Sequence, residues 1–342
     1  MSVSDTLSFS PLQVRRLPLS QLRGSIDASL PALGALAYGE GGGADWIAPV
    51  EATPLGSAPA MADLWQAGAE LRSGCAGAAR WRSDGQWSLG MIELHEQRQG
   101  DLEELAYQGY RQLFDALKQA GTPHLLRLWN YLPRINEDGG GLERYRQFNV
   151  GRQRAFTDAG LGVLEGAPAA CALGVHRGGL SIRFLAGQRA PVAIENPRQV
   201  SAYRYPSDYG PRPPLFSRAA LAELGDDQLA LFISGTASIV GHASVHPGDV
   251  AEQTRETLRN LQAVLDAAHR RCDARYSLDE LHLVVYVRHP AQAPTIRDVL
   301  VKALGPQAPA LRHAVFLEAD ICRHDLLVEI EAHAVASGAL SR

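Results

Sequence analysis

The clearest hydrophobic pattern in the chain runs from residue 230 to residue 268 and predicts a strand, a turn and a long helix. Residues 231–233 form a short apolar run of the kind that a buried strand shows. A turn ends at Asp249, and apolar side chains then recur every three or four positions from Val250 to Leu265. The carboxylate of Asp249 can cap the helix that this spacing indicates. We expect an amphipathic helix lying on a sheet.

A stretch in the first half of the chain repeats this pattern. The sequence from Asp101, DLEELAYQGYRQLFDALKQAG, aligns without a gap with the sequence from Asp249, DVAEQTRETLRNLQAVLDAAH. The strand-like segments LRLWNYL and LHLVVYV follow, with Tyr131 opposite Tyr286. Self-similarity of this kind indicates an internal repeat. We predict an α+β protein of two copies of one unit, an N-terminal domain at residues 1–165 and a C-terminal domain at residues 166–342.

Two further segments complete the pattern. Residues 1–59 show no clear periodicity, so we expect irregular structure there. Near the C-terminus, residues 326–334 alternate as a strand does, with Glu329, Glu331 and His333 on one face. From the pattern alone, the simpler interpretation of Glu329 is a carboxylate on a solvated sheet face.

Composition and charge narrow the class of protein. A chain of 342 residues with 46% hydrophobic and 20% charged residues is typical of a globular protein of two domains. A net charge of -4 gives no reason to expect a nucleic-acid partner. The 4 cysteines show no CxxC spacing, which argues against a zinc site. No apolar run reaches the length of a membrane span, so we expect a cytoplasmic protein with no membrane partner.

Two polar clusters between the repeats are candidates for chemistry. Residues 144–154 carry several arginines and no acidic residue, and residues 203–212 alternate tyrosine, arginine and proline. Arginines bind carboxylates in pairs of hydrogen bonds and tyrosines supply flat walls, so the mixture suits a small dianionic ligand with a ring. The alternative is a solvated helix face followed by an ordered loop, and composition alone slightly favours it.

Longer segments resemble known families. The stretch at residues 230–268, together with residues 281–287 and 326–332, resembles the RidA/YjgF superfamily. The segments RYRQFNVGRQRAF, ENPRQVSAYRYPSDYGPRPPLFSRA, ISGTASIVGH and ADICRHDLLVEIEAHA are similar to the chorismatase family. That resemblance implies two RidA/YjgF-like halves, each a mixed sheet backed by amphipathic helices, and an enzyme that removes the enolpyruvyl group of chorismate as pyruvate. It implies neither a metal nor a cofactor.

The same resemblance implies the site, which lies in the C-terminal domain. The resemblance implies that Glu329 is the general acid that protonates the vinyl ether. Gly235 and Cys322 resemble the members that release 3-hydroxybenzoate, alone or with 4-hydroxybenzoate, rather than a dihydroxycyclohexadiene carboxylate. Charge and the motif match together select the remaining binding residues, with arginines for the carboxylates and tyrosines for the pocket walls: Arg152, Arg212, Tyr145, Tyr205 and Tyr209.

Several alternatives stay open at this level. Gly235 can be a strand bulge and Cys322 a small buried side chain. A hydrolase that gives the diol, a RidA-like enamine or imine deaminase and a non-catalytic regulator that binds an aromatic acid share much of the pattern. RidA/YjgF proteins pack three copies together, and two fused copies could fill that role as a monomer.

Overall fold

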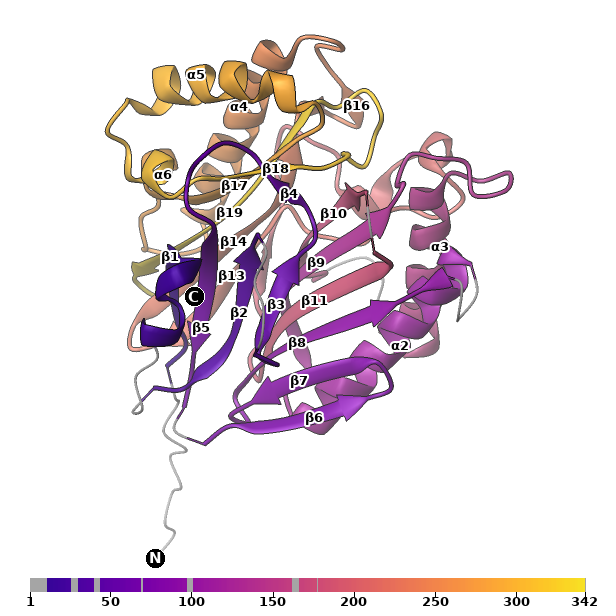
Figure 1. The fold of residues 1–342 in the computed structure, drawn as a ribbon, viewed down its shortest axis with the longest axis vertical. Helices are drawn as coiled ribbons and strands as arrows, with labels where there is room; N and C mark the ends of the chain where they lie inside the picture. The colour runs from indigo at the N-terminus through magenta and orange to yellow at the C-terminus, as the bar shows by residue number, and fades with distance from the viewer. Residues whose placement is uncertain are drawn as a thin grey trace, which may run out of the picture.

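The described residues form three main β-sheets, which are flanked by helices (Figure 1). The structure is a computed structural model and describes residues 11–25, 30–39, 44–68, 70–96, 101–161, 166–176 and 178–341. Among these residues, no helix is both long enough and apolar enough to cross a membrane.

Three strands of the first sheet lie within residues 1–59, which were expected to be irregular, so that expectation was wrong. Its strand order is β1-β5-β2-β3, and its strands are β1 (Gln13–Pro18), β2 (Ala32–Tyr38), β3 (Ile47–Val50) and β5 (Met61–Gln66). Every residue of β2 and β5 is buried. β2 consists largely of alanine and glycine, which have low β-propensity, and β5 carries Asp63 and Gln66 inside a buried strand, so neither shows the long apolar run by which a buried strand is recognised.

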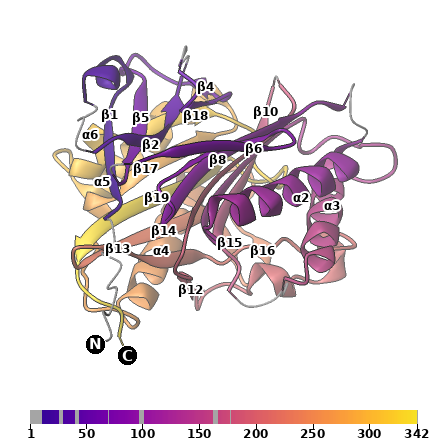
Figure 2. The same ribbon diagram turned by 90° about the horizontal axis from the view of Figure 1, so that it is seen from below.

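The second sheet has the order β10-β9-β11-β8-β7-β6. It comprises β6 (Arg72–Ala76), β7 (Ala79–Ser83), β8 (Trp87–Leu94), β9 (His124–Pro133), β10 (Ala169–Val175) and β11 (Leu180–Gly187). Helices α2 (Leu102–Ala120) and α3 (Arg144–Asp158) pack on its outer face (Figure 2).

The third sheet has the order β12-β13-β14-β19-β17-β18-β4. Its strands are β12 (Val192–Ile194), β13 (Ala219–Gly225), β14 (Gln228–Ala237), β19 (Val328–Ser337), β17 (His282–Val287), β18 (Val315–Glu318) and β4 (Thr53–Pro54). Helices α4 (Val250–Ala268), α5 (Ala293–Leu304) and α6 (Pro309–Arg312) contribute to the core on its outer side, and a short hairpin joins β15 (Ile239–Val240) to β16 (Ala243–Ser244).

The predicted internal repeat is confirmed by the order of the strands. Strands β6 to β11 and β12 to β19 follow the same path. In each unit the central strand, β9 or β17, pairs in parallel with the next strand, β10 or β18, and antiparallel with the last strand, β11 or β19. The hydroxyls of Tyr131 and Tyr286, which the repeat aligns, meet at 3.0 Å. Asp101 and Asp249 cap α2 and α4, accepting hydrogen bonds from the backbone N–H groups of Glu104 and Glu252.

The pairing of strands β10 and β11 bears on where the two halves join. Strands β10 and β11 follow residue 165, yet they hydrogen-bond to β9 and β8 and complete the second sheet. A strand order shared by both halves requires these two strands in the first unit. We therefore propose that the first half ends near Gly187, rather than at residue 165.

One apolar core joins the inner faces of all three sheets. It brings together Trp65 of the first sheet, Trp129 of the second and Phe232 of the third. The rings of Trp65 and Phe232 lie 5.8 Å apart. Arg16 of β1 crosses from the first sheet to the third, pairing with Asp63 at 2.7 Å and donating to the backbone oxygen of Leu283. The first sheet therefore packs beside the sheets of the two repeats as a third side of the shared core.

Candidate active site

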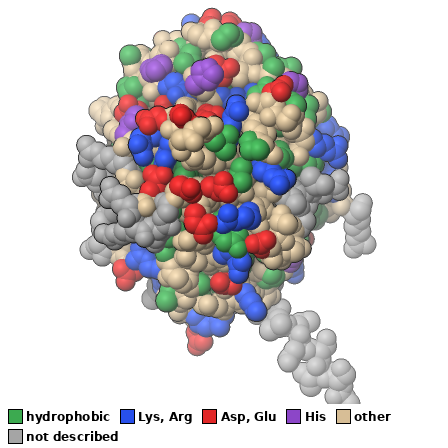
Figure 3. All heavy atoms as spheres, turned by 90° about the vertical axis from the view of Figure 1, so that its right-hand side faces the viewer, with side chains coloured by type: hydrophobic (Ala, Val, Ile, Leu, Met, Phe, Trp, Pro, Cys, Tyr) green, Lys and Arg blue, Asp and Glu red, His purple; other side chains and the backbone are tan. Residues whose placement is uncertain are grey.

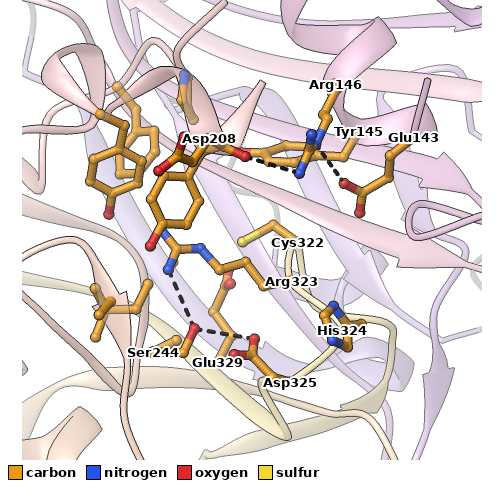
Figure 4. Close-up of a pocket in the computed structure, with 18 of the residues that line it drawn as sticks. Glu143, Tyr145, Arg146, Asp208, Ser244, Cys322, Arg323, His324, Asp325 and Glu329 are labelled. Carbon is orange, nitrogen blue, oxygen red and sulfur yellow. Dashed lines mark hydrogen bonds and ion pairs between the residues drawn. The ribbon is translucent and has the colours of Figure 1, made fainter. Parts of the chain in front are cut away.

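A cavity of about 250 Å³ lies where the two halves meet (Figure 4). Its walls come from α3, from the connection before β13, from β14, from residues 322–325 and from β19. The predicted residues in these walls are Tyr145, Tyr205, Tyr209, Gly235, Cys322 and Glu329. The structure thus brings together residues that lie far apart in the sequence.

Glu329 reaches the cavity from the inner face of β19. The predicted alternation is confirmed, because Val328, Ile330 and Ala332 pack in the outer core while Glu329 lines the cavity. Its side chain is only 3% exposed, so the face is not solvated. No hydrogen bond or ion pair joins its carboxyl group to another described side chain. Burial first, and the charge of Glu331 second, raise the pKa of Glu329 to about 8.

Gly235 leaves room for that carboxyl group. A Cβ atom at this position would lie 1.9 Å from Oε1 of Glu329. The pairing of β14 with β19 shifts between Ile233 and Thr236, so Gly235 also sits in a β-bulge, as the simpler interpretation of this residue had it. Any larger side chain here must displace the Glu329 carboxyl group.

Cys322 lies beside Glu329 on the loop before β19. It is partly buried and packs against the apolar core, and burial raises the pKa of its thiol to about 12. A thiol with this pKa is protonated at neutral pH and is a poor nucleophile. Cys322 therefore acts here as a small, uncharged wall of the cavity.

Two tyrosines and an arginine form the outer wall. The rings of Tyr205 and Tyr209 lie 5.3 Å apart, and the guanidinium of Arg323 lies 4.1 Å from the ring centre of Tyr209. Arg323 also donates to the backbone oxygen of His242 at 2.8 Å. Its buried Nη2 has no partner among the described residues, which leaves a donor available near the cavity.

The arginine cluster of α3 divides between two roles. Arg144 pairs with Glu96, Arg146 with Glu143 and Arg154 with Glu104. Arg152 is 1% exposed and lines a cavity of about 30 Å³ that shares Tyr145, Gly235, Cys322 and Glu329 with the larger one. Its Nε has no hydrogen-bond partner among the described residues. Three arginines are thus committed to ion pairs, and Arg152 lies at the inner end of the site.

Arg212 does not join this site, because its side chain is exposed and lines neither cavity. Arg218, which the sequence analysis did not select, lines the larger cavity instead. Arg218 is 4% exposed and donates to the Tyr205 hydroxyl at 2.8 Å. The sequence does carry a signal for Arg218, namely the hairpin turn at residues 225–228 between β13 and β14. This turn sets the pairing of the two strands, and in that pairing the backbone N–H of Ser234 donates to the backbone oxygen of Arg218. That register places Arg218 beside Gly235.

The first half carries no equivalent acid. In the first unit Tyr131 pairs with Ser181, whereas in the second Tyr286 pairs with Glu329. Ser181 therefore takes the place of Glu329, and it accepts a hydrogen bond from Arg183 at 2.5 Å. Within the described ranges, no three His, Cys, Asp or Glu side chains lie together as a metal site would require.

Two family models match the chain. One, described as chorismatase FkbO/Hyg5-like, N-terminal, matches residues 63–186, and the other, described as endoribonuclease L-PSP, matches residues 223–336. The first match ends next to the end of β11, as expected if β10 and β11 belong to the first half.

Similar proteins span most of the chain. A chorismatase from Streptomyces rapamycinicus is 39% identical over 280 residues, which cover 79% of this chain and 81% of that protein. A 3-hydroxybenzoate synthase from Streptomyces hygroscopicus is 36% identical over 285 residues, covering 80% and 82%. The crystal structure of a chorismatase superposes with a TM-score of 0.83 at 32% identity, covering 96% of this chain and 99% of that one. The chain belongs to the chorismatase family.

Proposed function

We propose that this enzyme cleaves chorismate to pyruvate and 3-hydroxybenzoate, alone or with the 4-isomer. The observation that carries the proposal is Glu329, a buried carboxyl group with no hydrogen-bond or ion-pair partner in the described part of the chain, which opens into a cavity lined by arginines and tyrosines. With a pKa of about 8, this group holds a proton at neutral pH, as a general acid must.

Glu329 starts the reaction by giving its proton to the terminal methylene carbon of the vinyl ether. The ether becomes an oxocarbenium ion, and its bond to the ring is now weak. The neighbouring ring hydroxyl attacks the ring carbon that bears the ether, the C–O bond breaks with its electron pair going to the oxygen of pyruvate, and the hydroxyl proton passes to the Glu329 carboxylate, which restores the acid. The arene oxide that remains then isomerises: its oxygen takes up a proton as the ring opens, and a ring carbon loses one, which gives the hydroxybenzoate. The atoms of the two products add up to those of chorismate, so no water is consumed.

Arginines inside the cavity hold the two carboxylates of the substrate. Arg218 and Arg152 are both buried, and each has an Nε that has no partner among the described residues. Unpaired buried donors are costly, so a carboxylate that reaches them binds well. We assign carboxylate binding to these two arginines and to Arg323, rather than to Arg212.

Gly235 and Cys322 favour the aromatic product over the diol. The diol requires an attacking water, whereas the arene oxide requires that water be kept away from the ring. Gly235 allows the Glu329 carboxyl group to lie against β14, and Cys322 covers its side with an uncharged thiol. Together they leave Glu329 as an acid and supply no second charged group to activate water.

The test is an incubation of the protein with chorismate, in which pyruvate is measured by a coupled assay and aromatic products by chromatography. We expect pyruvate with 3-hydroxybenzoate, and a loss of at least about 10²-fold in kcat for Glu329→Gln. Asp325→Asn is the matched control, because Asp325 also lines the cavity and asparagine can still accept the hydrogen bond of Ser244. This control should keep most of the activity.

The other outcomes separate the alternatives. Pyruvate with a non-aromatic diol would identify a hydrolase and overturn the roles given to Gly235 and Cys322. Binding of chorismate without turnover would indicate a regulator. If the folded protein ignored chorismate and acted on enamines or imines, it would be a deaminase, and the proposal would fail.

A further inference from the structure

A second buried carboxylate lies two residues beyond Glu329 on the same face of β19. Glu331 is 3% exposed and both of its oxygens are occupied. Oε2 accepts a hydrogen bond from Arg127 Nη2 at 2.6 Å, and Oε1 accepts one from Trp129 Nε1 at 3.1 Å. Both donors come from β9, in the other half of the molecule. The carboxylate is therefore fixed as one partner of a buried ion pair.

The two carboxyl groups of β19 have opposite surroundings. Glu331 has a cation and an indole N–H, whereas no described side chain donates to Glu329. Side chains at positions i and i+2 of a strand lie on the same face, with their Cα atoms roughly 7 Å from each other. The charge of Glu331 therefore acts on Glu329 through the protein interior, where it is poorly screened. A fixed negative charge at this position favours the neutral form of Glu329.

Arg127 explains why this charge is needed. Its guanidinium is buried, donates to the backbone oxygen of Ile233 at 3.0 Å and so lies close to the bulge that holds Gly235. Without Glu331, this guanidinium would act on Glu329 uncompensated and would favour the ionised carboxylate. Because Glu331 neutralises Arg127, this guanidinium can be buried near Glu329 without favouring loss of the Glu329 proton.

The other charged groups around Glu329 also influence its pKa. Burial raises the pKa of Glu329 and so does Glu331, whereas Arg127, Arg218 and Arg288 lower it. The further titratable groups that face Glu329 or line the two cavities are Tyr145, Arg146 and Arg152 of α3, Cys171 of β10, Tyr286 of β17, Tyr205, Asp208 and Tyr209 before β13, and Glu143, Cys322, Arg323, His324 and Asp325 on the loops. Among all these groups, Glu331 is the anion with the largest effect on Glu329.

We propose that Glu331 is a positioning residue for the proton transfer: held by Arg127 and Trp129, its negative charge offsets Arg127 and keeps Glu329 in the acid form. This inference rests on the proposed function of Glu329 as the general acid. It assigns to the buried ion pair a part in catalysis rather than in stability alone.

The pH dependence of kcat/KM tests this proposal. A raised pKa means that Glu329 is protonated below about pH 8 and loses its proton as the pH rises further, so the wild-type rate should fall through that range. Glu331→Gln keeps the shape of the side chain and removes the charge. We expect its basic limb to move to lower pH by about one unit or more, which is about a tenfold loss at pH values above the limb.

Two further variants separate charge from structure. Glu331→Gln combined with Arg127→Gln removes both charges, and we expect the basic limb to return toward its wild-type position. Trp129→Phe removes a hydrogen bond without changing any charge, so its limb should stay in place. A Glu331→Gln enzyme whose rate falls equally at all pH values, with the limb unmoved, would show a merely structural role and overturn the proposal.

A direct titration of Glu329 makes the outcome independent of turnover. The C=O stretch of a protonated buried carboxyl group is visible by infrared difference spectroscopy, and Glu329→Gln identifies the band that belongs to Glu329. We expect this band to disappear at lower pH in Glu331→Gln than in the wild-type protein. If the band disappeared at the same pH in Glu331→Gln and in the wild-type protein, the proposal would be contradicted, whatever the substrate is. Absence of chorismate turnover with a shifted band would instead contradict the proposed function alone.

Discussion

The contact between Gly235 and Glu329 decides where the acid can point. The Cβ position of Gly235 lies 1.9 Å from Oε1 of Glu329, which is far inside van der Waals contact. The backbone of Gly235 does not require a glycine, since its φ angle is not among the positive values in the chain. Space for the carboxyl group is therefore the reason for glycine here.

Gly235→Ala should misplace the acid. The added methyl group must push the carboxyl group aside by more than an ångström, and a misplacement of this size can cost about 10²-fold in rate. We expect a lower kcat and a larger share of the diol, measured by product chromatography with chorismate. Ala237→Gly is the control, because Ala237 also lines the cavity on β14 and the change only removes a methyl group. Unchanged rate and products in Gly235→Ala would contradict this role.

The residues of the site were only partly predictable. Alternation placed Glu329 on one face of a strand, but its burial depends on the first half, which covers that face through Arg127 and Cys171. In the same way, the sequence of α3 does not show which of its arginines form ion pairs with acidic residues. Arg144 and Arg154 find glutamates on neighbouring elements, whereas Arg152 finds none. Partners distant in sequence decide these roles.

At the level of elements, the two long helices are the best-predicted parts of the molecule. Both have a strong period of three to four residues and an aspartate at the N-cap, and both begin where the sequence indicates. Strands β2 and β5 of the first sheet were missed because β2 is rich in alanine and glycine and β5 contains buried polar residues. Local signals therefore located the helices and the strands with long apolar runs, such as β9 and β17, and failed where alanine, glycine or buried polar residues interrupt the run.

The matched caps allow a paired prediction. Asp249→Ala and Asp101→Ala each remove one hydrogen bond to a backbone N–H, and each should lower the free energy of unfolding by about 0.5–2 kcal/mol. Urea unfolding followed by circular dichroism measures the change. The asparagine variants at the same positions keep an acceptor and should lose less. Equal losses for alanine and asparagine would show that the aspartate charge, rather than the hydrogen bond, stabilises these helices.

At the scale of the whole molecule, three sheets share one core although only two repeats are present. Trp65, Trp129 and Phe232 come from three different sheets and pack in the same cluster. The first sheet thus covers the apolar surface that two repeats alone would leave open. The sequence could not show this, because no pattern in residues 11–66 resembles the repeat unit.

This arrangement predicts that the protein is a monomer. Large exposed hydrophobic side chains among the described residues are limited to Leu161, Val240 and Val335. Figure 3 shows one face on which hydrophobic side chains are scattered among acidic and basic ones. A stable interface needs a larger continuous apolar patch, so we expect no self-association.

Sedimentation equilibrium checks this expectation. It should give the mass of one chain over a wide range of protein concentration, and the turnover rate per chain should not change on dilution, because both halves of the site belong to one chain. A mass that rises with concentration toward three chains, together with activity lost on dilution, would mean that the first sheet does not complete the core. Another copy of the chain would then supply the missing part of the core.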